Sequence, residues 1–106
     1  MNDLAYKVWE KAFGNKEVAF DFAGREIHKS AYGDQNSKYR WDIHHIYPKA
    51  KGGSNELHNL IPAHIDTNRE AGDKTAYTAN GRNFEVIKDK EKTKKLGKRA
   101  YEIREK

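Results

Sequence analysis

Few residues of this chain can form an apolar core, and this scarcity limits the folds open to it. Only 18 of its 106 residues are Leu, Ile, Val or Phe, below the roughly 20% at which a chain risks disorder. Two Trp and six Tyr are spread along the sequence, and aromatic side chains bury a large area each. We therefore expect one folded domain over residues 1–106, with a small core helped by local hairpins or a bound metal ion.

The absence of cysteine narrows the possible chemistry. It excludes disulfides, a thiolate nucleophile and any cysteine-built zinc site. The first residues, MNDLAYKVWEKAF, lack the apolar run of a signal peptide. No stretch approaches the length of a membrane span. We expect a cytoplasmic protein with no membrane partner.

The formal net charge of +5 is concentrated at the C-terminal end. Residues 1–87 hold twelve Lys/Arg and twelve Asp/Glu, whereas residues 88–106 hold nine basic and four acidic residues. A basic segment of this kind is typical either of a solvated helix face or of contact with a polyanion. Both alternatives stay open from charge alone.

Hydrophobic spacing and turn residues predict short elements throughout. Helical spacing with a cap at Asn2 or Asp3 and a terminating Gly14 predicts an N-terminal helix. The remaining segments read as a hairpin at 17–33, a strand at 39–47, a loop at 48–59, a short strand at 60–63, a helix starting within 64–74 and a hairpin at 77–87 turning at Asn80-Gly81. From Lys88 onward we expect a basic helix. The fold class is therefore α+β.

The segment WDIHHIYPKAKGGSNELHNLIPAHIDTNRE, residues 41–70, concentrates imidazole and amide groups. Hydrolysis of a phosphodiester needs a base for the attacking water and positive charge on the phosphate oxygens. A histidine suits the base, because free imidazole is mostly neutral near pH 7. An imidazole and an amide oxygen, with water completing the shell, can hold a divalent ion. His44, His45, Asn59 and Asn68 are the candidates.

Adjacent histidines on a regular strand point to opposite faces. His44 and His45 can therefore share a site only where the strand ends or kinks, and Pro48 makes such an end reasonable. Asn59, at the start of the return strand, is placed to bond the loop backbone, since its side chain both donates and accepts.

The segment with these residues resembles the HNH endonuclease motif. It reads DIHHIYPKAKGGSNELHNLIPAHIDTNR, and the match centres on residues 40–72. The matching features are His44-His45, Ile46, Pro48, Gly52-Gly53, Asn59-Leu60 and Asn68. The resemblance implies a ββα-metal core flanked by the N-terminal helix, the hairpins and the basic C-terminal helix.

The resemblance also assigns roles to individual residues. It implies that His44 and Asn68 are metal ligands, that His45 is the general base and that Asn59 orients the loop. Arg69, beside Asn68, becomes a candidate phosphate contact. Two further candidates, Lys49 and Lys51, lie in the loop.

Two features depart from the family pattern. Many members hold the fold with cysteine half-sites around zinc, whereas His64 and Thr67 stand where the second half-site would fall. We expect aromatic packing to replace that zinc, with a His28–His64 zinc site as the alternative. The other departure is Asn68 where many members have His. An amide oxygen favours one Mg²⁺ or Mn²⁺ ion, with Ni²⁺ or Zn²⁺ as alternatives.

Asp42 and His64 are candidates for supporting the metal ligands. Asp42 shares a strand face with His44, although it could equally pair with Arg40. The leading interpretation of the whole is a metal-dependent DNA endonuclease, RNA not being excluded, encoded by a bacterium, a phage or a mobile element. A monomer would nick and a homodimer could cut both strands. The alternatives are a non-catalytic nucleic-acid-binding module, and the nuclease end of a toxin partnered by an immunity protein.

Overall fold

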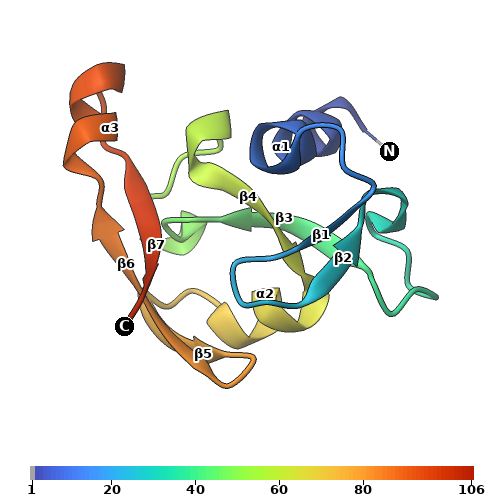
Figure 1. Ribbon diagram of the computed structural model, residues 1–106. Helices are drawn as coiled ribbons and strands as arrows, with labels where there is room; N and C mark the ends of the chain where they lie inside the picture. Colours follow the sequence, from blue (N-terminus) through green and yellow to red (C-terminus); the bar gives the residue numbers. More distant parts are fainter. Residues whose placement is uncertain (1) are drawn as a thin grey trace.

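The computed structural model describes residues 2–106, in which short helices alternate with antiparallel strand pairs (Figure 1). In chain order the elements are α1 (Asp3–Phe13), β1 (Val18–Phe20), β2 (Glu26–His28), β3 (Trp41–His45), β4 (Leu60–His64), α2 (Ile65–Ala71), β5 (Ala76–Ala79), β6 (Arg82–Lys88), α3 (Lys90–Leu96) and β7 (Tyr101–Glu105). Single 3-10 turns lie at Lys29–Ala31, Lys49–Lys51 and Leu57–Asn59. This content confirms the α+β class. Among the described residues, no helix has the length and apolarity needed to cross a membrane.

The N-terminal helix begins and ends where its capping residues predict. The Asn2 side chain accepts a hydrogen bond of 2.7 Å from the amide of Ala5, which satisfies a donor that the helix itself leaves free. Gly14 ends α1 with a φ of 64°. The buried face of the helix carries Val8 and Trp9, so α1 supplies apolar area that the strands lack.

Three small antiparallel sheets hold the strands: β1–β2, β3–β4 and β5–β6–β7. The two hairpins predicted at 17–33 and 77–87 are confirmed. The second one turns at Asn80 and Gly81, whose φ angles are 53° and 73°. Positive φ at both central residues is the geometry that matches the twist of the flanking strands.

Two aromatic clusters form the interior. In the first, α1 packs on β3 through Trp9 and Trp41, whose rings lie 5.2 Å apart. In the second, β5 and β6 pack against the β1–β2 connection and α2, with Phe22 meeting Phe84 edge-on at 5.2 Å. Burial of each such ring supplies area that the few aliphatic residues do not.

The helix α2 follows β4 without a connecting loop. His64 caps it, because the Nδ1 atom of His64 accepts a 3.0 Å hydrogen bond from the amide of Asp66. Gly72 ends it with a φ of 53°. In Figure 1 α2 lies beneath the β3–β4 pair, and Asn68 of α2 contacts His44 near the end of β3.

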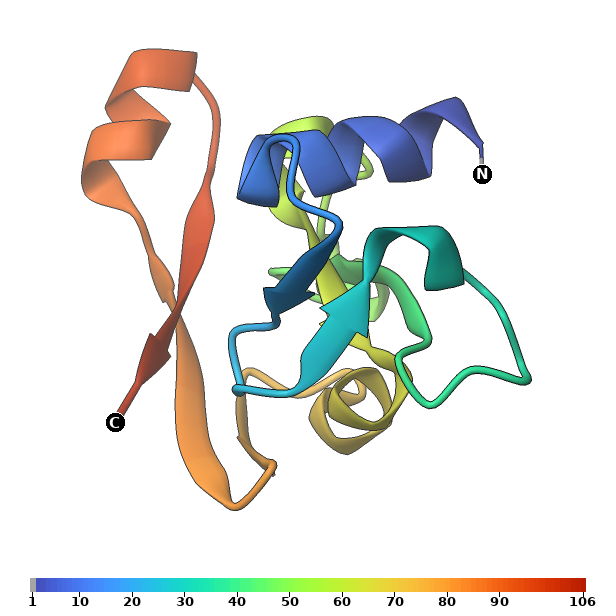
Figure 2. The same ribbon diagram turned by 45° about the vertical axis from the view of Figure 1, so that its right-hand side comes forward.

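The prediction of a helix from Lys88 to the C-terminus is wrong for its second half. The helix α3 stops at Leu96 because Gly97 adopts a left-handed φ of 68°. The chain then returns as β7, which pairs with β6 in a register that sets Ile103 opposite Val86. Figures 1 and 2 show α3 at the end of the β6–β7 ribbon, away from α2. We call residues 88–101, comprising α3 and its two connections, the basic arm.

A buried carboxylate joins the first hairpin to the end of β4. Asp21 accepts hydrogen bonds from the amides of Ala23 and Arg25 at its own turn, at 3.0 and 2.9 Å. Its other oxygen accepts a 2.9 Å bond from the amide of His64. Asp21 is only 5% exposed, so water could not take the place of its carboxylate as the acceptor for these three amides.

Replacement of Asp21 by Ala should lower the free energy of unfolding by about 3 kcal/mol, because it leaves buried amide donors unpaired. Asp34→Ala, which removes one hydrogen bond from an exposed turn, should cost less than about 1 kcal/mol. Urea unfolding of both variants measures the difference. Equal losses would contradict the role given to Asp21.

Candidate active site

The end of β3 brings both adjacent histidines to one pocket. His44 and His45, together with Asn68, line a pocket of about 160 Å³. His44 is buried and points toward α2, whereas the half-buried His45 points toward the loop that follows. The strand ends at His45, as the sequence required for the two imidazoles to share a site. The pocket is also lined by Lys49 and Asp73.

His44 and Asn68 are in direct contact across β3 and α2. The Nδ1 atom of His44 lies 2.7 Å from the Oδ1 atom of Asn68. The His44 ring also lies 5.7 Å from the Phe22 ring in a tilted arrangement. Burial lowers the pKa of His44 below its ordinary value, against a smaller raising effect of the bond to Asn68. The imidazole is therefore neutral near pH 7, which is the form that binds metals.

These two atoms are the ones in the pocket that would hold a divalent ion. The Nδ1 and Oδ1 atoms lie 2.7 Å apart as a hydrogen-bonded pair, and an imidazole nitrogen and an amide oxygen are both groups that bind divalent ions. One imidazole and one amide leave most of the shell to water and substrate, as Mg²⁺ sites commonly do. Within residues 2–106, no group of three or more His, Asp or Glu is arranged to hold a metal ion. The donor set thus suits a weakly held ion rather than a closed structural zinc site.

The loop between β3 and β4 is fastened by the side chain of Asn59. Its amide nitrogen donates to the carbonyl oxygens of Tyr47 and Ser54, at 3.1 and 2.9 Å. Its amide oxygen accepts from the amide of Tyr47 at 2.9 Å. Gly53 lies so close to this turn that a Cβ atom there would be 1.8 Å from the Tyr47 carbonyl oxygen. Asn59 thus uses its donor and acceptor together, as its place in the sequence predicts.

Asn55 was missed by the sequence analysis. Its Oδ1 atom lies 2.7 Å from Nε2 of His45. The contact comes from within the Gly-Gly-Ser-Asn loop, and only the shape of that loop brings it back to the strand end. Asp73 was also missed, because it reaches the pocket only through the way α2 packs against β3. No pattern in the sequence indicated that either would reach the pocket.

The basic candidates occupy different places. Lys49 lies on the rim of the histidine pocket, whereas Lys51 lines a second pocket on the other side of the loop. Arg69 is 70% exposed and lies 3.9 Å from Asp66. All three side chains are accessible to a ligand.

The two candidates for supporting the metal ligands are engaged elsewhere. Asp42 accepts a hydrogen bond from the amide of Ile43, and within residues 2–106 it forms no ion pair with Arg40. His64 uses Nδ1 for the helix cap and Nε2 for a 2.8 Å bond to the Lys38 carbonyl oxygen. That leaves neither ring nitrogen of His64 free for zinc. That Asp42 and His64 support the metal ligands stays a prediction.

Asn59→Asp tests the fastening of the loop. It keeps the shape of the side chain but turns a donor toward two carbonyl oxygens into an acceptor, so the loop should open while the strands persist. We expect amide hydrogen exchange of Tyr47 and Glu56 to accelerate at least tenfold, with α1 amides unchanged. Unchanged exchange in the loop would contradict this role.

Comparison with known proteins agrees with this geometry. A family model described as HNH endonuclease matches residues 22–77, more than half of the chain. Neither a search of curated proteins nor a search of solved structures gives a match. The matched range contains His44, His45, Asn59 and Asn68. Proteins of this family are generally nucleases that commonly use a divalent metal ion, so a nucleic-acid substrate is indicated. The chain belongs to the HNH endonuclease family.

Proposed function

We propose that this protein is a metal-dependent endonuclease that hydrolyses phosphodiester bonds in DNA, with residues 1–106 acting as one nuclease domain. The observation that carries the proposal is the shared pocket of His44, His45 and Asn68 at the end of β3. On this proposal β3, β4 and α2 form the ββα-metal core of the family. Three different elements then deliver a base, two ligands and a fastened loop to one place.

His45 would act as the general base. With the Nε2 proton donated to Asn55, the Nδ1 atom keeps the lone pair that takes a proton from the attacking water. The bond to Asn55 also restricts rotation of the ring. Asn59 acts through the loop, because it fixes the segment on which Asn55 lies.

His44 and Asn68 would hold one divalent ion, Mg²⁺ or Mn²⁺ being the best match to an amide oxygen. When bound, such an ion supplies positive charge for the phosphate oxygens and the leaving group. Lys49 lines the pocket, Arg69 follows Asn68 on α2, and both side chains are exposed. They would contact neighbouring phosphates. Contacts of this kind position a duplex without reading its sequence, and they weaken steeply with salt.

The test of the proposal is cleavage of supercoiled plasmid DNA in Mg²⁺, Mn²⁺ or Ni²⁺, with and without EDTA. Wild-type protein should nick or linearise the plasmid only with metal. His45→Ala should lower the rate by about 10²–10⁴-fold. The matched control is His28→Ala, which removes an imidazole that bonds Glu26 and stacks on Tyr39 away from the pocket.

Circular dichroism of both variants separates loss of chemistry from loss of fold. DNA binding that persists with no cleavage under any ion would refute the catalytic proposal. It would instead support the alternative, a nucleic-acid-binding module on the same scaffold.

Asn55→Ala should reduce kcat about tenfold and leave KM unchanged, because it frees the His45 ring without touching a substrate contact. The melting temperature should not change, since Asn55 is exposed. Asn36→Ala, in another exposed turn, is the control. If KM instead rose about tenfold while kcat stayed unchanged, Asn55 would bind substrate rather than position the base.

A further inference from the structure

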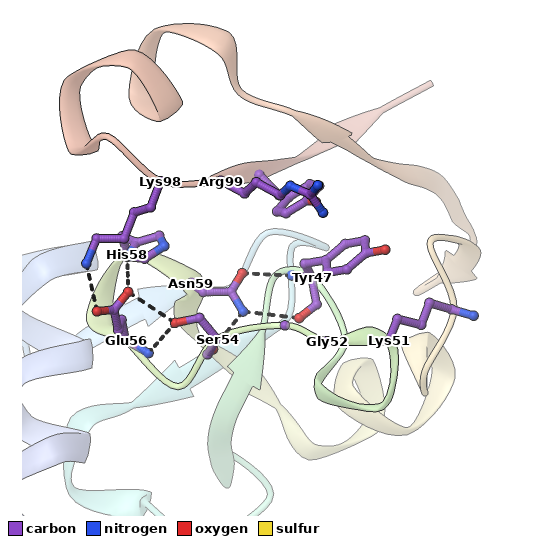
Figure 3. Close-up of a pocket in the computed structure, with 11 residues that line it drawn as sticks. Tyr47, Lys51, Gly52, Ser54, Glu56, His58, Asn59, Lys98 and Arg99 are labelled. Carbon is purple, nitrogen blue, oxygen red and sulfur yellow. Dashed lines mark hydrogen bonds and ion pairs between the residues drawn. The ribbon is translucent and has the colours of Figure 1, made fainter.

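A second pocket, of about 350 Å³, lies on the other side of the loop that follows β3. One wall is the loop itself, from Lys51 to Glu56, and the opposite wall is the end of the basic arm at Lys98 and Arg99. Figure 3 shows these two walls facing one another, with Tyr47 between them. The volume falls within the range of about 300–1,000 Å³ usual for ligand sites.

The side chains that line the pocket carry a net positive charge. Its lining has three permanent cations, Lys51, Lys98 and Arg99, and one carboxylate, Glu56. Glu56 pairs with Lys98 at 2.8 Å, and that hydrogen bond lowers the pKa of Glu56. Among residues 2–106, neither Lys51 nor Arg99 has a carboxylate partner. Arg99 is therefore an uncompensated cation on the wall of the pocket, whereas Lys51 lies at its edge with its ammonium group extending away from the basic arm (Figure 3). An uncompensated guanidinium is the group expected to bind an anionic ligand.

The two walls are joined by several contacts. The rings of Tyr47 and Tyr101 stack at 4.1 Å with an angle of 11° between their planes. The Nζ atom of Lys92 donates to the carbonyl oxygen of His58 at 3.3 Å, in addition to the Lys98–Glu56 pair. These contacts hold the arm against the loop, so the pocket is formed in the free protein and a ligand need not order it.

The location of the pocket relates it to the candidate active site. The loop from Tyr47 to Asn59 separates the two, with Lys49 on the rim of the histidine pocket and Lys51 in the second one. Asn59 lines the second pocket while fastening the loop that carries Asn55. A polyanionic strand lying over His45 would cross this loop and reach the second pocket.

We infer that the pocket between the loop and the basic arm binds a backbone phosphate of the DNA strand that flanks the cleaved bond. Arg99 is its anchoring cation, Lys98 joins Arg99 when the phosphate displaces Glu56, and Lys51 adds positive charge at the edge of the pocket. The inference rests on the proposed function, since it assumes the same DNA substrate. It adds a subsite built partly from residues outside the matched range 22–77.

The first test measures binding of a fluorescent DNA duplex in EDTA, so that cleavage plays no part. Arg99→Gln should weaken binding roughly five- to tenfold at about 0.1 M salt, and should lower the slope of log Kd against log salt by about 0.9. The matched control is Lys94→Gln, the same loss of charge on α3 at a position outside the pocket. It should weaken binding about twofold or less. Equal effects of the two variants would overturn the subsite.

The second test measures DNA binding after the charge of Glu56, the one carboxylate that lines the pocket, is removed. Glu56→Gln frees Lys98 and removes a negative charge from the pocket, so DNA binding should tighten several-fold. Glu91→Gln makes the same charge change on the exposed side of α3 and should have a smaller effect. Unchanged or weaker binding by Glu56→Gln would count against a phosphate in this pocket.

Amide chemical shifts separate the possible sources of phosphate. Addition of duplex should shift residues 51–54 and 98–101, whereas inorganic phosphate alone should not. Comparable shifts with inorganic phosphate would show a site for a free anion and overturn the strand assignment. Plasmid cleavage by the wild type is measured in parallel: cleavage with equal Arg99 and Lys94 effects refutes only the subsite. Absence of both cleavage and binding refutes the proposed function and the subsite together.

Discussion

The side chain of Asn59 is the interaction on which both pockets depend. Three hydrogen bonds from one amide close the loop between β3 and β4 onto Tyr47 and Ser54. An aspartate would turn an acceptor toward two carbonyl oxygens, and a leucine of similar size would leave three polar groups unpaired. The same closure sets Asn55 against His45 and Glu56 against Lys98 of the basic arm. One amide therefore determines the shape of both sides of the loop.

The chain has few apolar residues, and its interior consists of two small clusters built around aromatic side chains. Trp9 and Trp41 centre the first, and Phe22 and Phe84 centre the second. The first cluster includes Trp41 of β3 and the second includes Ala71 of α2. Asp21 joins the two sides through hydrogen bonds to the buried amides of Ala23 and His64. Because Phe22 also contacts His44, the second cluster supports the candidate site directly. Packing in this way provides the rigidity that a site on a short loop requires.

Much of this arrangement could be predicted from local signals, and the rest depends on contacts distant in sequence. Asn80-Gly81 determines its hairpin. His44 and Asn68, which the sequence analysis assigned to one site, lie 2.7 Å apart. The strand β7 was missed because Leu96, Ala100 and Ile103 have helical spacing, and this spacing was followed past Gly97. A glycine at that place ends a helix. Asn55 and the second pocket were missed because each needs two segments brought together by the loop closure, which no periodicity encodes.

The basic arm gives a physical reason for the uneven charge of the chain. The arm is docked on the loop through Tyr101, Lys92 and Lys98, so the positions of its lysines are fixed relative to the candidate active site. Docking brings like charges together, which is visible at Lys11: burial, and secondarily the charge of Lys92, lowers its pKa to about 8. Repulsion of this kind is relieved when a polyanion is bound. On the proposed function, an arm that concentrates cations beside the candidate active site serves to bind the nucleic-acid substrate that the family implies.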